Sequence, residues 1–215
     1  MPNLHVHNEF VTFLNLDPKG TVRKKKTVRV ALFQPRWKPS QFKKDLERGF
    51  LYWHTDQSAV SRWLKECRKI VEELIVEADN DTGFLLIFPE LSIPENLVDE
   101  FKKWKFFDKC IIIAGSTYYN DNDKYYSKAC VYVGGEPHLT DKIIPAPNTE
   151  KIESAGKGLS DGHKIKVFQG TEIGSFAVLI CSDYLAQHIE RLIPIHQLDL
   201  YIVISFDSKG SQFLD

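Results

Sequence analysis

The chain of 215 residues lacks the features that would direct it to a membrane or to nucleic acid. No apolar run reaches the roughly 18 residues that a membrane-spanning helix needs. Residues 1–10 have no basic start followed by an apolar core, so no secretory signal is predicted. A net charge of −1 gives no general attraction to nucleic acid or to acidic lipid. These absences predict a cytoplasmic protein without membrane or nucleic-acid partners.

Cysteine is scarce and irregularly spaced. No two cysteines form a C-x-x-C pair, which argues against both a zinc site and a disulfide framework. The sequence also has no glycine-rich phosphate loop and no G-x-S-x-G motif, so neither a phosphate cradle nor a serine nucleophile is indicated. Free thiols of this kind are typical of a reducing compartment. The four cysteines are Cys67, Cys110, Cys130 and Cys181.

Apolar residues make up 43% of the chain, which is enough for a core, and they follow strand and helix patterns. Short apolar runs bounded by glycine or proline predict buried strands, and three- and four-residue spacing predicts helices. The elements alternate strand, helix, strand, helix, strand before a β-rich middle and a final strand, helix, strand, which predicts a layered α/β fold. Expected strands are residues 27–34, 84–88, 110–114, 125–133, 139–144, 164–168, 173–180 and 198–206, and expected helices are residues 57–79, 94–104 and 184–196.

Two segments have weaker patterns. Residues 1–26 are treated as an N-terminal extension that can form a short hairpin or an edge strand. Residues 35–56 form a long connection, and a connection of that length is usually functional, mobile or partly helical. Its aromatic residues can line a pocket or cover the core, and the sequence does not decide between the two.

The stretch from Phe176 to Cys181 is where the sequence points to chemistry. A buried strand ends directly in Cys181, and a helical pattern begins soon afterwards. A thiol at such a strand end projects from the sheet edge, where open α/β folds place their functional groups. Free cysteine is also among the most buried residue types, so this stretch alone favours a packed side chain slightly over a functional thiol.

Two further charged residues, Glu90 and Lys142, follow other predicted strands. A thiol with a pKa of about 8.5 is mostly protonated at neutral pH and needs a base or a cation beside it to act as a nucleophile. Glu90 can take the proton, and Lys142 can stabilise both the thiolate and the oxyanion that forms on attack. The N–H of Ser182 can supply a second donor to that oxyanion. Together, the three strand ends indicate nucleophilic catalysis.

Residues 88–90, Lys142 and residues 180–183 resemble the Glu–Lys–Cys signature of the nitrilase, or carbon–nitrogen hydrolase, superfamily. The resemblance covers about residues 28–206. Each match is weak by itself, but all occur in order at a strand end or in the loop that follows. Further matching positions are Gln34, Glu150, Gly162 and Gly174.

The resemblance implies an αββα sandwich over residues 27–215, with Glu90 as general base, Lys142 as oxyanion stabiliser and Cys181 as nucleophile. It implies that Glu150 helps to position the substrate, and Ser182 is expected to contact the substrate as well. The implied reaction is hydrolysis of a non-peptide carbon–nitrogen bond, in a small-molecule amide or nitrile, through a cysteine thioester. The family needs no cofactor or metal, and its subunits usually form homodimers or higher oligomers.

Several departures from the family pattern leave alternatives open. Ser182 stands where an aromatic residue is common, the interval from Glu90 to Lys142 is short, and the chain ends at Asp215, before strands that family members carry. A non-catalytic nitrilase-like binding or assembly module, possibly within a larger multidomain protein, is therefore the main alternative. A thiol hydrolase that uses His163 or His188 is a weaker one. The final strand, which reads as buried on both faces, predicts that the chain associates.

Overall fold

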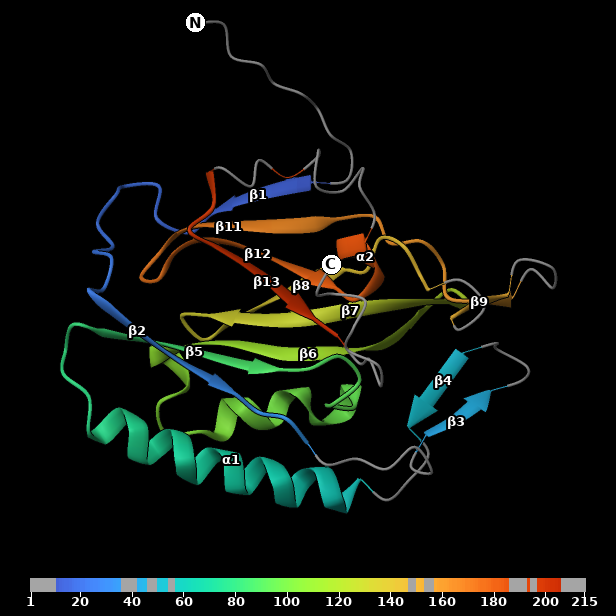
Figure 1. Cartoon of the computed structure of the whole chain (residues 1–215), viewed down its shortest axis with the longest axis horizontal. Coiled ribbons are helices and arrows are strands. Elements are labelled where there is room, and N and C mark those ends of the chain that lie inside the picture. The colour runs from blue at the N-terminus through green and yellow to red at the C-terminus, as the bar shows by residue number, and fades with distance from the viewer. Residues whose placement is uncertain are drawn as a thin grey trace, which may run out of the picture.

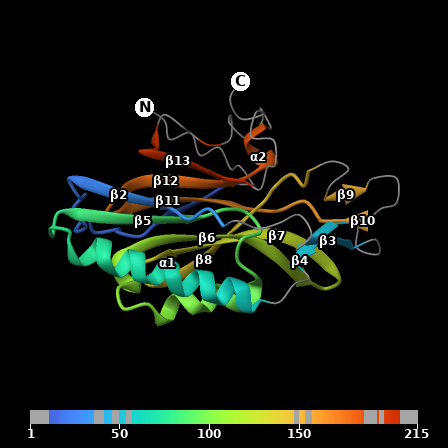
Figure 2. The same ribbon diagram turned by 60° about the horizontal axis from the view of Figure 1, so that its bottom comes forward.

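The computed structural model describes residues 11–35, 42–45, 50–53, 57–146, 150–152, 157–185, 193 and 197–205. Two β-sheets are stacked face to face, and helix α1 covers the outer face of one of them (Figures 1 and 2). The short helix α2 lies on the outer side of the other sheet (Figure 2). The layers therefore follow the order helix, sheet, sheet, helix, which confirms the αββα sandwich.

The first sheet has five strands in the order β2-β5-β6-β7-β8. Strands β2, β5 and β6 run parallel, and β7 and β8 extend the sheet in antiparallel fashion. Parallel neighbours need a crossover, and α1 and two 3₁₀ segments provide it on the outer face. The bounds are β2 (Thr27–Leu32), α1 (Ser58–Val76), β5 (Thr82–Phe88), η2 (Glu95–Lys103), η3 (Phe107–Lys109), β6 (Cys110–Asp121), β7 (Lys124–Val133) and β8 (Glu136–Asp141).

The second sheet has four strands in the order β1-β11-β12-β13. Its first strand, β1, comes from the predicted N-terminal extension and pairs in parallel with β11, so this segment forms an edge strand. The interior faces of the two sheets meet in one apolar core that includes Ile113, Val131, Phe176 and Val178. The bounds are β1 (Val11–Asn15), β11 (Ile165–Thr171), β12 (Gly174–Ile180), α2 (Ser182–Leu185) and β13 (Leu200–Ile204).

Two small hairpins complete the described elements. Strands β3 (Phe42–Asp45) and β4 (Phe50–Trp53) pair within the long connection, and β9 (Lys151–Ile152) pairs with β10 (Lys157–Gly158). The helix predicted over residues 184–196 begins as α2, and most of its remainder lies outside the described residues. Among the described residues no helix is long and apolar enough to span a membrane.

Strand β6 is longer than the sequence pattern predicts. The predicted end at Ala114 is wrong, because the strand continues to Asp121. Gly115 adopts a φ of +71°, and the pairing register with β7 shifts between Ile113 and Ser116. A β-bulge of this kind bends a strand without ending it. The glycine that looked like a strand end is therefore a bulge inside the strand.

An apolar face of β2 is left open by the described residues. Val28, Val30 and Leu32 lie on one side of the strand because side chains alternate, and Val28 packs into the core between the sheets. Val30 and Leu32 are nevertheless 52% and 72% exposed. In the second sheet β13 is an edge strand, paired with β12 alone among the described strands. Open strand edges and apolar patches of this kind promote association.

We expect the 24.8 kDa chain to self-associate in solution through this open face. Light scattering at micromolar concentration should give at least twice the chain mass, and Leu32→Lys should reduce it. Val76→Lys is a matched control, because Val76 is also 72% exposed but lies on α1. A monodisperse wild-type monomer with a cooperative melt and no dye-binding apolar surface would show that the expectation is wrong.

Candidate active site

Glu90 lies in the loop that follows β5 and is only 3% exposed. The loop turns sharply, since Leu91 has a φ of +57°, and the Leu91 N–H donates to the carbonyl of Ser116 at 2.9 Å. Gly115 permits this close approach, because a Cβ there would lie 2.3 Å from the carbonyl oxygen of Pro89. The bulged strand β6 therefore fixes the position of the Glu90 side chain.

Lys142 follows β8 directly and is 1% exposed. Its Nζ lies 2.9 Å from Oε1 of Glu90 and 2.6 Å from Oε2 of Glu150. Its backbone N–H donates to the carbonyl of Ser127 at 2.8 Å, which ties the lysine to β7. Burial by itself lowers the pKa of Lys142, but the carboxylates of Glu90 and Glu150 outweigh burial and raise it. The side chain therefore stays an ammonium ion.

Glu150 is the second carboxylate on this ammonium ion and is 5% exposed. Its Oε2 also accepts the N–H of Ala146 at 2.7 Å, and its carbonyl accepts the N–H of Leu159 at the same distance. Burial raises the pKa of Glu150, while Lys142 opposes the rise and Glu90 adds to it. Two buried carboxylates thus share one cation, and the negative charge of Glu90 makes the charged form of Glu150 less favourable.

Cys181 follows β12 and has a φ of +50°, a backbone conformation that residues other than glycine seldom adopt. Its N–H donates to the carbonyl of Ile204 on β13 at 2.8 Å, which holds the strained turn in place. Strain of this kind is concentrated at functional sites. Cys181 is partly exposed, whereas the other three cysteines are buried.

The groups around the sulfur keep it protonated at neutral pH. Burial raises the pKa of Cys181 to about 11, the carboxylate of Glu90 adds to the rise, and Lys142 and the hydroxyl of Ser205 oppose it. The expectation that Lys142 favours the thiolate is thus correct in direction, but burial and Glu90 outweigh the lysine. A base is therefore needed at the moment of attack, and Glu90 is the carboxylate that most affects the sulfur.

Ser182 directs its side chain into the protein rather than toward Cys181. Its hydroxyl donates to the carbonyl of Ile144. The contact with substrate that the sequence predicts for Ser182 would therefore be made by its backbone N–H and not by its hydroxyl. Of the two histidines in the Cys–His alternative, His163 has its ring 5.4 Å from that of Tyr126, and His188 lies outside the described residues.

The sequence analysis missed Tyr118, which the structure adds to this site. Burial raises the pKa of the Tyr118 hydroxyl well above its usual value, and Glu150, Glu90 and Cys181 add to the rise. The phenol is therefore within electrostatic range of all three groups. Tyr118 belongs to β6 beyond the bulge at Gly115, where the sequence predicted no strand. A periodicity that continued across the glycine was the only signal that could have found it.

A glycine fixes the chain around Lys142. A Cβ on Gly162 would lie 2.3 Å from the carbonyl oxygen of Lys142 and 2.7 Å from Cβ of Asp141, and the Gly162 N–H donates to the carbonyl of Ile143 at 3.2 Å. Position 162 was one of those that matched the family pattern. The structure gives it a physical reason, which is the close approach of two backbones.

We expect Gly162→Ala to reduce the free energy of unfolding by about 1–3 kcal/mol, since overpacking has a cost of this size. It should also lower any activity, because the added methyl group pushes Lys142 aside. Gly134→Ala is the control: a Cβ there meets nothing within 4 Å, so only the φ of +57° opposes it. Denaturant melts of both variants check the prediction, and equal losses would show that crowding at Lys142 is not the cause.

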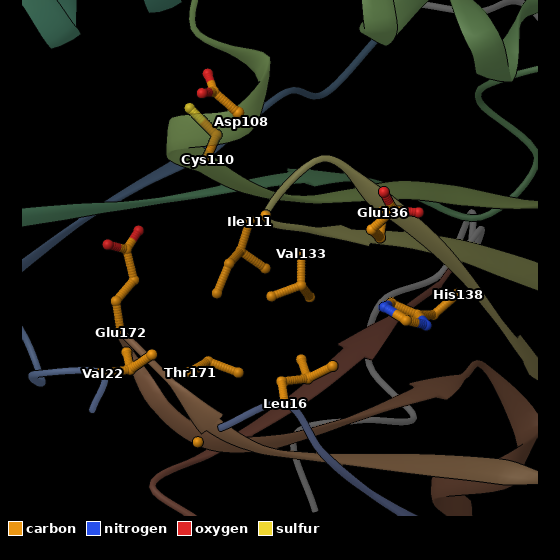
Figure 3. Close-up of a pocket in the computed structure, with 12 residues that line it drawn as sticks. Leu16, Val22, Asp108, Cys110, Ile111, Val133, Glu136, His138, Thr171 and Glu172 are labelled. Carbon is orange, nitrogen blue, oxygen red and sulfur yellow. The ribbon is translucent and has the colours of Figure 1, made fainter. Parts of the chain in front are cut away.

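A cavity of about 410 Å³ lies between the sheets, but none of the five predicted site residues lines it. Leu16, Ile111 and Val133 form apolar walls, and Asp108, Glu136, His138 and Glu172 lie around them (Figure 3). The lining comes from the segment after β1, from η3 and the start of β6, and from the β7–β8 and β11–β12 turns. Glu90 and Cys181 follow the C-terminal ends of β5 and β12, whereas the cavity lies near the N-terminal ends of β6 and β12. The cavity and the candidate site therefore occupy different ends of the sandwich.

Known protein families and curated proteins were compared with the chain by sequence, and neither comparison gives a match. Solved structures do match. Nit3 from Saccharomyces cerevisiae, a member of branch 10 of the nitrilase superfamily, superposes with a TM-score of 0.52 at 21% identity, covering 76% of this chain and 65% of Nit3. An amidase from Nesterenkonia sp. has a TM-score of 0.51 at 16% identity, covering 89% of this chain and 71% of that chain.

The chain has the nitrilase fold. A glutamine-dependent NAD+ synthetase from Acinetobacter baumannii shares it, with a TM-score of 0.51 at 18% identity over 73% of this chain. The present chain spans only 31% of that synthetase and 65% of Nit3. At these identities the likeness concerns the fold, and the nitrilase-fold chain must be assigned a function from the chemistry of its own residues.

Proposed function

We propose that this nitrilase-fold chain hydrolyses a non-peptide carbon–nitrogen bond, in an amide or a nitrile, through a thioester on Cys181. The observation that supports the proposal best is the buried ammonium group of Lys142, held between two carboxylates at the strand ends that also bear Cys181. Burying such charges costs several kcal/mol per ion. A module that only binds a partner gains nothing evident from this arrangement, whereas nucleophilic catalysis needs a base, a cation and a thiol together.

The reaction begins with transfer of the Cys181 proton to Glu90 as the sulfur attacks the substrate carbon. For an amide the tetrahedral oxyanion receives hydrogen bonds from Lys142 and from the backbone N–H of Ser182. An ammonium group has three N–H donors, and two of those of Lys142 are directed at Glu90 and Glu150, which leaves a third for the oxyanion. The other carboxylate, Glu150, holds Lys142 in this orientation.

Collapse of the tetrahedral intermediate breaks the carbon–nitrogen bond. Glu90 returns its proton to the leaving nitrogen, and ammonia or an amine departs from a thioester on Cys181. Glu90 then takes a proton from a water molecule, whose oxygen attacks the thioester carbon. The acid product leaves and the proton returns to the sulfur. Glu90 thus serves as base and then as acid in each half of the reaction, first toward Cys181 and the leaving nitrogen and then toward water and the departing sulfur.

A panel of small molecules tests the proposal. The full chain should release ammonia from at least one class among aliphatic amides, aromatic amides and nitriles, or from N-carbamoyl compounds. Glu90→Gln, which retains the shape of the side chain and loses its basicity, should abolish that release. Saturable binding of these compounds without turnover would instead support the non-catalytic binding module.

A further inference from the structure

The two residues after Cys181 join the cysteine turn to the chain that follows Lys142. Asp183 is completely buried, and its two carboxylate oxygens each accept a backbone N–H. Oδ2 accepts from Ile143 at 3.1 Å, and Oδ1 accepts from Ile144 at 2.8 Å. The hydroxyl of Ser182 donates to the carbonyl of Ile144. Three hydrogen bonds thus connect neighbouring residues of one loop to neighbouring residues of the other.

We propose that Asp183 is a positioning residue, which fixes Lys142 against Cys181 by anchoring the two residues that follow the lysine. The proposal rests on the proposed function for the step that this placement serves. A long lysine side chain can adopt many rotamers, so its Nζ is placed only if its backbone is held. Upstream, the Lys142 N–H donates to Ser127 at 2.8 Å. Downstream, Asp183 provides the corresponding anchor.

The surroundings of Asp183 show that this anchor has a cost. Ile143 and Ile144 pack with Leu179 of β12 and Tyr184 in an apolar cluster, so the carboxyl group is removed from water. Burial raises the pKa of Asp183 to about 7, although the N–H groups of Ile144 and Ile143 and the charge of Lys142 all oppose the rise. The carboxyl group offsets the cost of its own burial by accepting two backbone N–H groups that would otherwise be unpaired, which favours a role in holding the two loops together.

Replacement by asparagine separates this role from simple removal of charge. Asp183→Asn retains one acceptor but directs an NH₂ group at the second backbone N–H, so one of the two anchoring bonds is lost. If Lys142 then shifts, the cation that favours the thiolate of Cys181 moves away and the thiol becomes less reactive. If only a negative charge disappears, the thiolate is favoured and the thiol becomes more reactive. The two explanations predict changes of opposite sign.

Alkylation of the folded chain by iodoacetamide, with mass mapping of all four cysteines, measures this sign without any substrate. At about pH 8.5 we expect Asp183→Asn to label Cys181 three- to tenfold more slowly than the wild type, since a tenfold change corresponds to about one pKa unit. Ser182→Ala, which removes the third connecting bond, should change the rate in the same direction by less. The buried Cys67, Cys110 and Cys130 report on loss of structure, and their labelling should stay slow.

Asp199→Asn is the matched control. Asp199 also accepts a backbone N–H, from Ser175 at 2.7 Å, but it lies at the opposite end of β12. This variant should label Cys181 at the wild-type rate. An unchanged or faster labelling rate of Cys181 in Asp183→Asn overturns the proposal. If instead all four cysteines of Asp183→Asn become reactive, the variant has lost its structure and Ser182→Ala decides. A wild-type labelling rate of Cys181 in Ser182→Ala then also overturns the proposal.

Hydrolysis measured in parallel separates this inference from the proposed function. Slower labelling in Asp183→Asn, together with no hydrolysis by the wild-type chain, would retain the positioning role and remove the hydrolase. Hydrolysis by the wild type, together with equal labelling of Cys181 in the wild type and in Asp183→Asn, would retain the hydrolase and remove the positioning role.

Discussion

Replacement of Cys181 by alanine is expected to reduce hydrolysis by about 10⁴-fold or more, to the level of residual catalysis that remains after loss of a nucleophile. Cys181 lies at the strained turn after β12, and both Glu90 and Lys142 affect the pKa of its thiol. The fold should be little affected, because Cys181 is partly exposed and alanine leaves only a small void. Initial rates of ammonia release, corrected for the amount of folded protein, measure the loss.

Cys130→Ala provides the matched control. Cys130 is 3% exposed and packs on the face of β7 that is covered by α1, in the core that also contains Phe88 and Phe101. This change should lower stability modestly and leave the turnover rate of the folded protein unchanged. Cys181→Ser should retain a weak nucleophile and accumulate bound substrate. Activity in Cys181→Ala above about one per cent of the wild-type rate would contradict the assignment of the nucleophile.

Replacement of Lys142 by methionine is expected to have the largest effect on stability. The change preserves most of the side-chain volume but leaves the carboxyl groups of Glu90 and Glu150 buried without their cation. Breaking a buried ion pair on one side costs about 3–5 kcal/mol. Lys102→Met is the control: Lys102 lies 2.7 Å from Asp99 with 47% of its side chain exposed, and surface pairs of this kind contribute about 0–1 kcal/mol.

The loss should depend on pH, with a sign that follows from the charges. In the wild type the carboxylates of Glu90 and Glu150 raise the pKa of Lys142, so the stabilisation by its charge is present at neutral pH and is lost only in strongly alkaline solution. Lys142 opposes the rise in the pKa of Glu150, so without the cation that pKa rises further, and a raised pKa favours the folded state at low pH and disfavours it as pH increases. Lys142→Met should therefore lose stability relative to the wild type from mildly acidic to mildly alkaline pH. A constant difference in unfolding free energy across this range would contradict the ion-pair explanation.

The layers of the fold and the principal charged residues could be predicted because their signals are local. Short apolar runs predicted the strands around Glu90 and Cys181, and three- and four-residue spacing predicted α1. Glu150 was indicated by the family resemblance, and the structure places its side chain 2.6 Å from that of Lys142. The proximity of Glu90, Lys142 and Glu150 agrees with these signals, whereas the catalytic roles assigned to the residues stay predictions.

The features that could not be predicted depend on contacts between distant parts of the chain. Strand β1 pairs with β11, with Val11 opposite Ile165, and no pattern within a few neighbouring residues indicates a partner so far along the chain. Gly115 looked like a strand end in the sequence but forms a bulge within β6, so no strand was predicted at Tyr118. Asp183 stood within the recognised motif, but its partners Ile143 and Ile144 are 40 and 39 residues away. Its contacts with the lysine loop therefore became visible only in the structure.

The mass of the protein during turnover tests the central claim most directly. A reacting mixture of the full chain and a hydrolysed amide, quenched in acid and mapped by mass spectrometry, should show the acyl part of the substrate attached to the peptide that contains Cys181. The peptides with Cys67, Cys110 and Cys130 should be unmodified. Hydrolysis that proceeds with no adduct on Cys181, and that persists in Cys181→Ala, would contradict the account.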